Sequence, residues 1–348
     1  MEADENRHDR VDQEIGRLSE LLWALSRDGA ADAGLPAAGF SVTRADRGFL
    51  ARHGEGRPCV AFLAPGERHP EQGHRLITAA ALGAALATSR VTAGQPGAIV
   101  VVAGVPVPDG VTAALTFRPG GHTWSPSPLA ARAELRVSMH GRPGAGIDAL
   151  TGLVQTFTAV SALRPRPGTT VQGIVTRGGE STARMPEFAE ARFGLCAPGA
   201  ADLDRLAADV TACAEGAALA TGAKAVVERL GPHHAPLRDN PVLSARFTTH
   251  LAAHGIVATP PGPDRPPEWS EVGDVSVRVP TLHPSVAIAD PAHVAGTPEF
   301  AVAAASRRAC STLLATAAAL ARTAVDLLAH PSLVRQVQDA FAAEAGQD

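Results

Sequence analysis

The stretch with the clearest chemical potential is a polar loop that carries a histidine between two apolar segments. The run Cys59–Ala64 has the composition of a buried strand, and residues 78–88 have that of an Ala-rich buried helix. Between them, residues 71–77 include Gln72 and His74. Ligands of open α/β sheets bind outside the carboxyl ends of strands, where this loop is expected. His74 is therefore a candidate ligand or general acid and base, and a histidine that caps the following helix is the alternative.

A second candidate group lies farther along the chain. Arg118 follows a strand-like run at residues 111–117, and a guanidinium there could bind a carboxylate or phosphate in bidentate fashion. A surface arginine at a strand end is the plainer interpretation. Asp109 and His74, together with His122 or His293, could form a single-metal site. Four well-placed ligands are usually needed for such a site, which argues against it.

The composition predicts a folded protein of two domains, or of one domain with a large insertion. The chain has 348 residues, of which 45% are hydrophobic and 19% charged, so a sizeable core is possible. The 31 Lys and Arg residues against 35 Asp and Glu give a net charge of −4. No general attraction toward nucleic acid or an anionic membrane is therefore expected. The absence of Tyr also argues against base-stacking platforms.

The cysteines and the apolar runs favour a cytoplasmic location. The 4 cysteines are scattered without a CxxC pair, as expected for inert thiols in a reducing compartment. No apolar stretch follows the charged N-terminus, so we expect no signal peptide. The longest apolar run, residues 310–330, is interrupted by Arg322 and Asp326. It predicts a packed core helix rather than a membrane span.

The spacing of the apolar residues divides the chain into two parts with different hydrophobic patterns. Residues 1–128 and 237–348 contain continuous apolar runs such as Gly97–Ala103, which are typical of strands buried on both faces of a parallel sheet. Residues 129–236 contain alternating, half-exposed strands in the order strand, helix, strand, strand, helix, strand, as in a ferredoxin-like domain. The predicted strands are 40–42, 59–63, 97–103, 111–117, 133–139, 170–176, 188–195, 223–230 and 275–279, and the predicted helices are 11–26, 76–89, 147–163, 200–221, 240–254 and 298–343 with a break at Pro331.

Short motifs occur in a fixed order along nearly the whole chain. Residues 270–284 read SEVGDVSVRVPTLHP, residues 296–300 read GTPEF and residues 72–74 read QGH. Together they resemble the aminoacylase and carboxypeptidase-like amidohydrolases, a dizinc exopeptidase family, in the branch of the indole-acetyl-amino-acid and aminobenzoyl-glutamate hydrolases. The resemblance implies a dizinc-exopeptidase-like α/β catalytic domain built from residues 1–128 and 237–348. It further implies that residues 129–236 form an inserted ferredoxin-like α+β lid or dimerisation domain.

The resemblance also implies a metal site in which most ligands are replaced. Gln72 stands for a cysteine ligand, and its neutral amide oxygen is a poor ligand for zinc. Pro108 stands for the general base and cannot accept a proton, while Asp109 stands for a glutamate ligand. Arg118 stands for a histidine ligand, and a fixed cation there repels a metal. Of the assigned ligands only His74 clearly persists, so we predict neither a bound metal nor another cofactor.

Three functional hypotheses follow, and the sequence leaves open whether the protein is an enzyme. The first is a diverged family member that has lost dizinc amide hydrolysis and binds an acyl-amino-acid or small amide-like ligand in the old cleft. The second is a catalytically dead partner or scaffold that forms a homodimer or heterodimer through the lid. The third is a metal-dependent amidohydrolase or peptidase with shifted ligands. The candidate catalytic residues are His74 and Arg118, the candidate ligand-binding residues are Gln72, Asp109, His122 and Glu271, and the shifted ligands of the third hypothesis are Asp109, His122 and His293.

Overall fold

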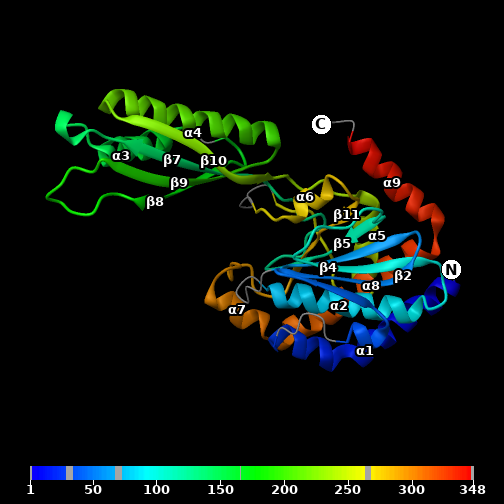
Figure 1. Cartoon of the computed structure of the whole chain (residues 1–348). Helices are drawn as coiled ribbons and strands as arrows, with labels where there is room; N and C mark the ends of the chain where they lie inside the picture. The colour runs from blue at the N-terminus through cyan, green and yellow to red at the C-terminus, as the bar shows by residue number, and fades with distance from the viewer. Residues whose placement is uncertain (1, 29–33, 67–72, 165, 263–267, 346–348) are drawn as a thin grey trace. The chain divides into compact units, whose positions relative to one another are not determined.

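The chain forms two compact units. A computed structural model describes residues 2–28, 34–66, 73–164, 166–262 and 268–345 (Figure 1). Unit 1 lies within Met1–Ser127, Arg238–Pro263 and Val275–Asp348, and unit 2 lies within Pro128–Leu237 and Asp264–Asp274. The segment that ends at Asp274 thus belongs to unit 2, although the sequence places it in the domain built from the chain ends.

Unit 1 is built on a six-stranded mixed sheet with the order β1-β2-β4-β3-β5-β11. β4, β3, β5 and β11 are parallel, while β1 and β2 form an antiparallel hairpin at the β4 side. A separate parallel pair joins β6 and β12. The strands are β1 (Ser41–Ala45), β2 (Gly48–Glu55), β3 (Cys59–Ala64), β4 (Gly97–Ala103), β5 (Ala113–Leu115), β6 (Arg118–Gly120), β11 (Thr281–Leu282) and β12 (Ser285–Ala287).

Helices α1, α2 and α8 pack together beside this sheet. α2 and α8 both contact β3, and α1 packs on α2 and α8, on the side of α2 away from the sheet (Figure 1). A Cβ on Gly83 of α2 would lie 2.6 Å from Leu22 Cδ1 of α1, so this glycine permits the close approach of the two helices. The helices of unit 1 are α1 (Glu2–Asp28), α2 (His74–Val91), α5 (Pro241–Ala252), α7 (Pro298–Ala304), α8 (Arg307–Ala329) and α9 (Pro331–Ala345).

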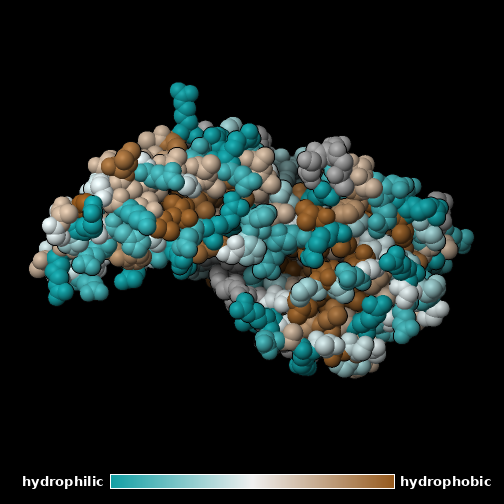
Figure 2. All heavy atoms as spheres, turned by 45° about the horizontal axis from the view of Figure 1, so that its top comes forward, coloured by the Kyte–Doolittle hydropathy of each residue, from teal (hydrophilic) through white to brown (hydrophobic). Residues whose placement is uncertain are grey.

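The most apolar long helix is a core helix, as the sequence predicts. α8 is long and apolar enough to cross a membrane, but 83% of its most apolar stretch of residues is buried inside the protein. Its polar residues Arg322 and Asp326 are also buried. Figure 2 shows hydrophilic and hydrophobic residues intermixed over the visible face. The apolar surface of α8 is thus used in packing the α/β core.

Unit 2 has the predicted order of strands and helices. Its four strands form an antiparallel sheet with the order β10-β7-β9-β8, and α3 and α4 pack against each other and on β7 and β9. This is the ferredoxin-like arrangement. The elements are β7 (Ala131–His140), α3 (Ala149–Ser161), β8 (Thr170–Arg177), β9 (Phe188–Ala197), α4 (Ala200–Thr221) and β10 (Lys224–His234).

Two local predictions are wrong. No strand is predicted between residues 42 and 59, yet residues 48–55 form β2, in which buried Phe49 and Ala51 alternate with polar or partly exposed neighbours. Residues 275–279 were expected to be a strand, yet residues 275 and 276 end the short helix α6 (Val272–Ser276) and residues 277–279 form a turn and a bend. The Asp274 carboxylate at α6 accepts hydrogen bonds at 2.7 Å from the Ala235 N–H and from His234 Nδ1. This local bonding holds a turn where the valine pattern alone favours a strand.

Candidate functional site

His74 begins α2 at the carboxyl end of the parallel strands of unit 1. It follows Gly73, whose φ of 70° lies in the left-handed region. A Cβ on Gly73 would lie 2.5 Å from Pro119 Cγ and 3.4 Å from Phe300 Cε1. Glycine therefore lets α2 begin directly against β6 and α7. His74 is half-buried, and its carbonyl accepts a hydrogen bond from Thr78 Oγ1 at 3.1 Å.

Arg118 lies next to this contact, because it precedes Pro119 on β6. Its backbone N–H donates to the Pro284 carbonyl at 2.8 Å, which fixes β6 beside β12. Successive side chains on a strand point to opposite faces, so Arg118 points away from the face that Pro119 presents to Gly73. The structure thus brings the backbones of the two catalytic candidates together.

The positive charge of Arg118 affects the protonation of His283. Burial, followed by the positive charge of Arg118, lowers the pKa of His283 to about 4. The ring is 4% exposed, and its Nδ1 lies 3.3 Å from the carbonyl oxygen of Ser127. At neutral pH the His283 imidazole is therefore uncharged and within reach of the positive charge of Arg118.

Asp109 lies toward the other end of the sheet. Its neighbour Gly110 lies beside Arg57, since a Cβ on Gly110 would lie 3.6 Å from Arg57 Nη2. The N–H of Thr112 donates to the carbonyl of Cys59, the first residue of β3, at 2.7 Å. Because the histidine loop follows the last residue of β3, the structure does not bring Asp109 to it.

The remaining candidates are scattered. His122 is exposed and stacks on Trp124, with ring centroids 4.5 Å apart and planes 5° apart. Glu271 is exposed and belongs to unit 2, where its carbonyl accepts the N–H of Asp274 at 3.0 Å. Gln72 lies outside the described residues.

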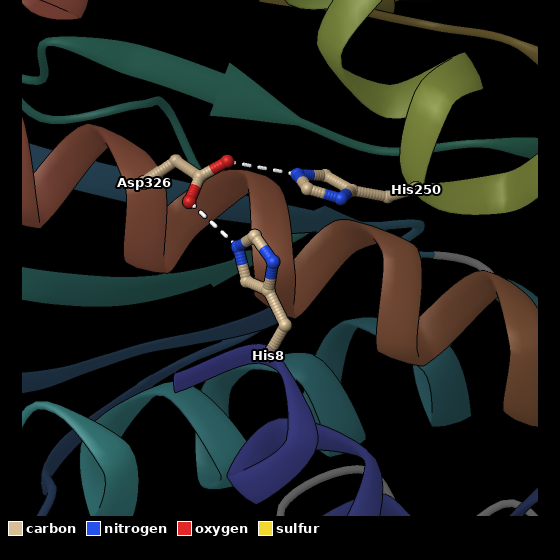
Figure 3. Close-up of side chains that lie close together, drawn as sticks. All are labelled: His8, His250 and Asp326. Carbon is tan, nitrogen blue, oxygen red and sulfur yellow. Dashed lines mark hydrogen bonds and ion pairs between the residues drawn. The ribbon is translucent and has the colours of Figure 1, made fainter. Parts of the chain in front are cut away.

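One cluster of possible metal ligands is present in the part of the chain that the structure describes, and it was not predicted. His8 of α1, His250 of α5 and Asp326 of α8 point toward one another (Figure 3), with their ligand atoms within 4.8 Å. His8 Nε2 lies 2.8 Å from Asp326 Oδ1, and His250 Nε2 lies 2.8 Å from Oδ2. This cluster contains none of the shifted ligands of the third hypothesis, which are Asp109, His122 and His293.

Charge and burial make the cluster a tightly held polar group. Burial would raise the pKa of Asp326, but hydrogen bonds from His250 and His8 outweigh it and hold the pKa well below its usual range. Burial lowers the pKa of His250, although Asp326 opposes that shift. Arg246 Nη1 lies 3.6 Å from Asp326 Oδ2, and Arg322 pairs with a different carboxylate on α1. The cluster therefore consists of a carboxylate with two imidazoles as its main partners.

A signal for the cluster is present in the sequence. His8 extends the buried stripe of α1 that continues at Val11 and Ile15, and His250 shares a buried face of α5 with Phe247. Each histidine thus occupies a core position of an amphipathic helix. Buried polar groups need partners, so the sequence indicates that each histidine has one, although it does not identify Asp326 as that partner.

At the carboxyl edge of unit 1, the structure describes one of the candidate ligands, His74, near the strand that carries Arg118. A dizinc centre needs several His, carboxylate or thiolate ligands and a carboxylate base. Among the residues that the structure describes there, His74 is accompanied by the Arg118 cation, and Asp109 lies elsewhere. The cluster of His8, His250 and Asp326 also lies away from this edge, near the amino ends of the strands. Leu328, two residues after Asp326, reaches the amino end of β4, since a Cβ on Gly97 would lie 2.6 Å from its Cδ2.

Comparisons with known proteins agree with the predicted resemblance. No family model matches the chain. The Xaa-Arg dipeptidase of Mus musculus is 27% identical over 315 residues, which cover 81% of this chain and 73% of the mouse protein. The Xaa-Arg dipeptidase of Homo sapiens is 28% identical over 203 residues, which cover 57% of this chain and 46% of the human protein.

Two solved structures share the fold over most of the chain. The Bacillus subtilis YXEP protein, a dinuclear metal binding peptidase from the M20 family, has a TM-score of 0.65 at 16% identity and covers 92% of this chain and 99% of its own. The aminobenzoyl-glutamate utilization protein from Klebsiella pneumoniae has a TM-score of 0.68 at 14% identity and covers 91% of this chain and 98% of its own. The resemblance and the fold predicted from the sequence are thus confirmed: the chain has the fold of the M20 dinuclear metal peptidases and aminohydrolases.

Proposed function

We propose that this protein is a diverged member of the amidohydrolase fold that binds an acyl-amino-acid or a similar small amide and no longer hydrolyses it with two zinc ions. The observation that carries the proposal is the cation Arg118 at the carboxyl edge of unit 1, at the position where the resemblance implies a histidine metal ligand. A cytoplasmic location completes the proposal, and the four free cysteines support it.

The local electrostatics favour an anionic group of a ligand. The guanidinium of Arg118 presents parallel N–H donors that match a carboxylate. The first backbone N–H groups of α2, beginning at His74, carry the positive end of the helix dipole. The neutral ring of His283 adds no competing charge. Each of these features suits a carboxylate better than a second metal ion.

The curated relatives support the class of ligand. The mouse relative is named as a dipeptidase for Xaa-Arg, and any dipeptide combines an amide bond with a free carboxylate. An acyl-amino-acid has the same two groups. Retention of the fold over 92% of the chain keeps the setting in which such molecules are bound.

Calorimetry on metal-free protein tests this function. We expect a panel of N-acyl amino acids to yield at least one saturable ligand, and Arg118→Gln to weaken its binding by about 10- to 100-fold, because a charge-assisted hydrogen bond contributes about 1.5–3 kcal/mol. Arg57→Gln, near the amino end of β3, is the matched control and should leave binding unchanged. Amide hydrolysis that requires added zinc and disappears in His74→Gln would show that the hydrolytic reaction persists.

A role as the partner of a second chain is favoured by the edge strand of unit 2. β8 lies at the edge of the sheet, and its Ile174 and Val175 side chains are 63% and 52% exposed. An exposed apolar edge strand is a template for pairing with another chain. We therefore propose a homodimer of this chain through β8.

Light scattering after size exclusion tests the dimer. Ile174→Lys should convert it to a monomer, because a charge placed on an apolar edge blocks strand pairing. Leu219→Lys on α4 is the matched control, since Leu219 is equally apolar and 86% exposed but lies on a helix. A wild-type monomer would exclude the homodimer and leave a different chain as the partner.

A further inference from the structure

We propose that His8, His250 and Asp326 form a binding site for a divalent transition-metal ion, with Zn²⁺ as the preferred occupant, that joins three helices of unit 1. The ligand set is two imidazole nitrogens and one carboxylate oxygen, each from a different helix (Figure 3). Imidazole and carboxylate ligands suit Zn²⁺ and its first-row neighbours. Three protein ligands leave a fourth position for water, as in open zinc sites.

The distances require little rearrangement. Zinc binds nitrogen and oxygen at about 2.0–2.2 Å, so ligand atoms around a tetrahedral ion lie about 3.3 Å apart. The two Nε2 atoms each lie 2.8 Å from an oxygen of Asp326, and all three ligand atoms lie within 4.8 Å of one another. Small side-chain rotations would therefore open a space for the ion. The protons now shared with the carboxylate would leave when the ion binds.

The surroundings suit a structural ion with slow exchange. Asp326 and His250 are buried, whereas His8 is 16% exposed and gives a path from solvent. Two cations are close and lower the affinity. Arg322 is neutralised by Asp12, with Nε 3.0 Å from Oδ1, and Arg246 is partly exposed and can turn toward water. One carboxylate and two imidazoles then remain to hold the ion.

The site would fasten segments that are far apart in the chain. His8 lies in the first helix, His250 follows the return of the chain from unit 2, and Asp326 lies near the end of α8. An ion there would stabilise the folded state by an amount that grows with its concentration, because the unfolded chain does not present the three ligands together. It would do so at the amino end of β4, away from His74.

Metal titration of the metal-free full-length chain tests the proposal. Zinc measured by elemental analysis after equilibrium dialysis should reach one ion per chain, and Co²⁺ should give the visible absorption of a four-coordinate site. His8→Gln and His250→Gln should each weaken binding by at least about tenfold, since glutamine can keep a hydrogen bond to Asp326 but is a poor metal ligand. Circular dichroism confirms that each variant is folded.

His330→Gln is the matched control, because His330 pairs with Asp4 at 2.9 Å but belongs to no group of three possible ligands among the residues that the structure describes. Its zinc binding should equal that of the wild type. The proposal fails if the wild type binds no zinc, or if His8→Gln and His250→Gln bind zinc as the wild type does. If zinc binding is lost only in His74→Gln, the zinc is bound at the carboxyl edge of unit 1 instead. That result would contradict the proposed function. The two proposals can therefore fail separately.

Discussion

Replacing Asp326 with asparagine is expected to lower the free energy of unfolding by about 3–5 kcal/mol. The carboxylate is 2% exposed and accepts hydrogen bonds from His8 and His250, while Arg246 lies 3.6 Å away. An amide has one acceptor oxygen, and its NH₂ group would face a donor. One buried imidazole would thereby lose its acceptor, and a buried polar group left without a partner costs free energy.

Urea denaturation at neutral pH in the presence of a chelator measures this loss without any contribution from bound metal. Asp9→Asn is the matched control, because Asp9 lies on α1 beside His8 but is exposed. Its effect should stay within about 0.5 kcal/mol. A loss below about 1 kcal/mol for Asp326→Asn would mean that the cluster is not held as the structure shows.

The cluster of His8, His250 and Asp326 could be predicted from the sequence only in part. Arg322 and Asp326 are visible as polar residues in an apolar run, and their presence predicts a core helix with buried partners. The partners His8 and His250 cannot be read from periodicity, because each lies on its own helix. Only the packing of α1 and α5 against α8 decides that the three side chains meet.

The fold was more accessible because its signals are local. The continuous apolar run of β4 predicts a strand buried on both faces, and each of its residues after the first is buried. The hairpin strand β2 was missed because Arg52 and His53 make it look like a loop, although the face carrying Phe49 is buried against the core. Alternation over a few residues with one buried face is a weak signal.

The candidate site was only partly accessible for the same reason. His74 was placed by its position after β3, which depends on neighbouring residues alone. Asp109 was placed by the resemblance, as the counterpart of a glutamate ligand, but residues 104–112 return along the sheet to the amino end of β3. The path of a loop depends on where the next strand pairs, and no short pattern encodes that.

Acidification from pH 7 to pH 4 is expected to reduce the stability of unit 1 by about 3 kcal/mol through His283 alone. Its pKa is about 4 in the folded protein because of burial and the charge of Arg118, against an ordinary value of 6.5. Below pH 6.5 His283 is protonated in the unfolded chain, whereas in the folded chain it is protonated only near pH 4. Stability therefore falls with pH across this window, by about 1.4 kcal/mol for each unit of the difference.

A comparison of His283→Asn with the wild type isolates this contribution. Other buried histidines, including His250, shift in the same direction but are present in both proteins. The difference in free energy of unfolding between the two proteins, measured by urea titration at pH 7 and pH 4, should change by about 3 kcal/mol in favour of the variant. Val286→Ala, a core change on β12 without a titratable group, should give the same difference at both pH values. If His283→Asn behaves like this control, the imidazole of His283 is not held neutral by burial and by the charge of Arg118. The positive edge of unit 1 that the proposed carboxylate ligand requires would then not be present.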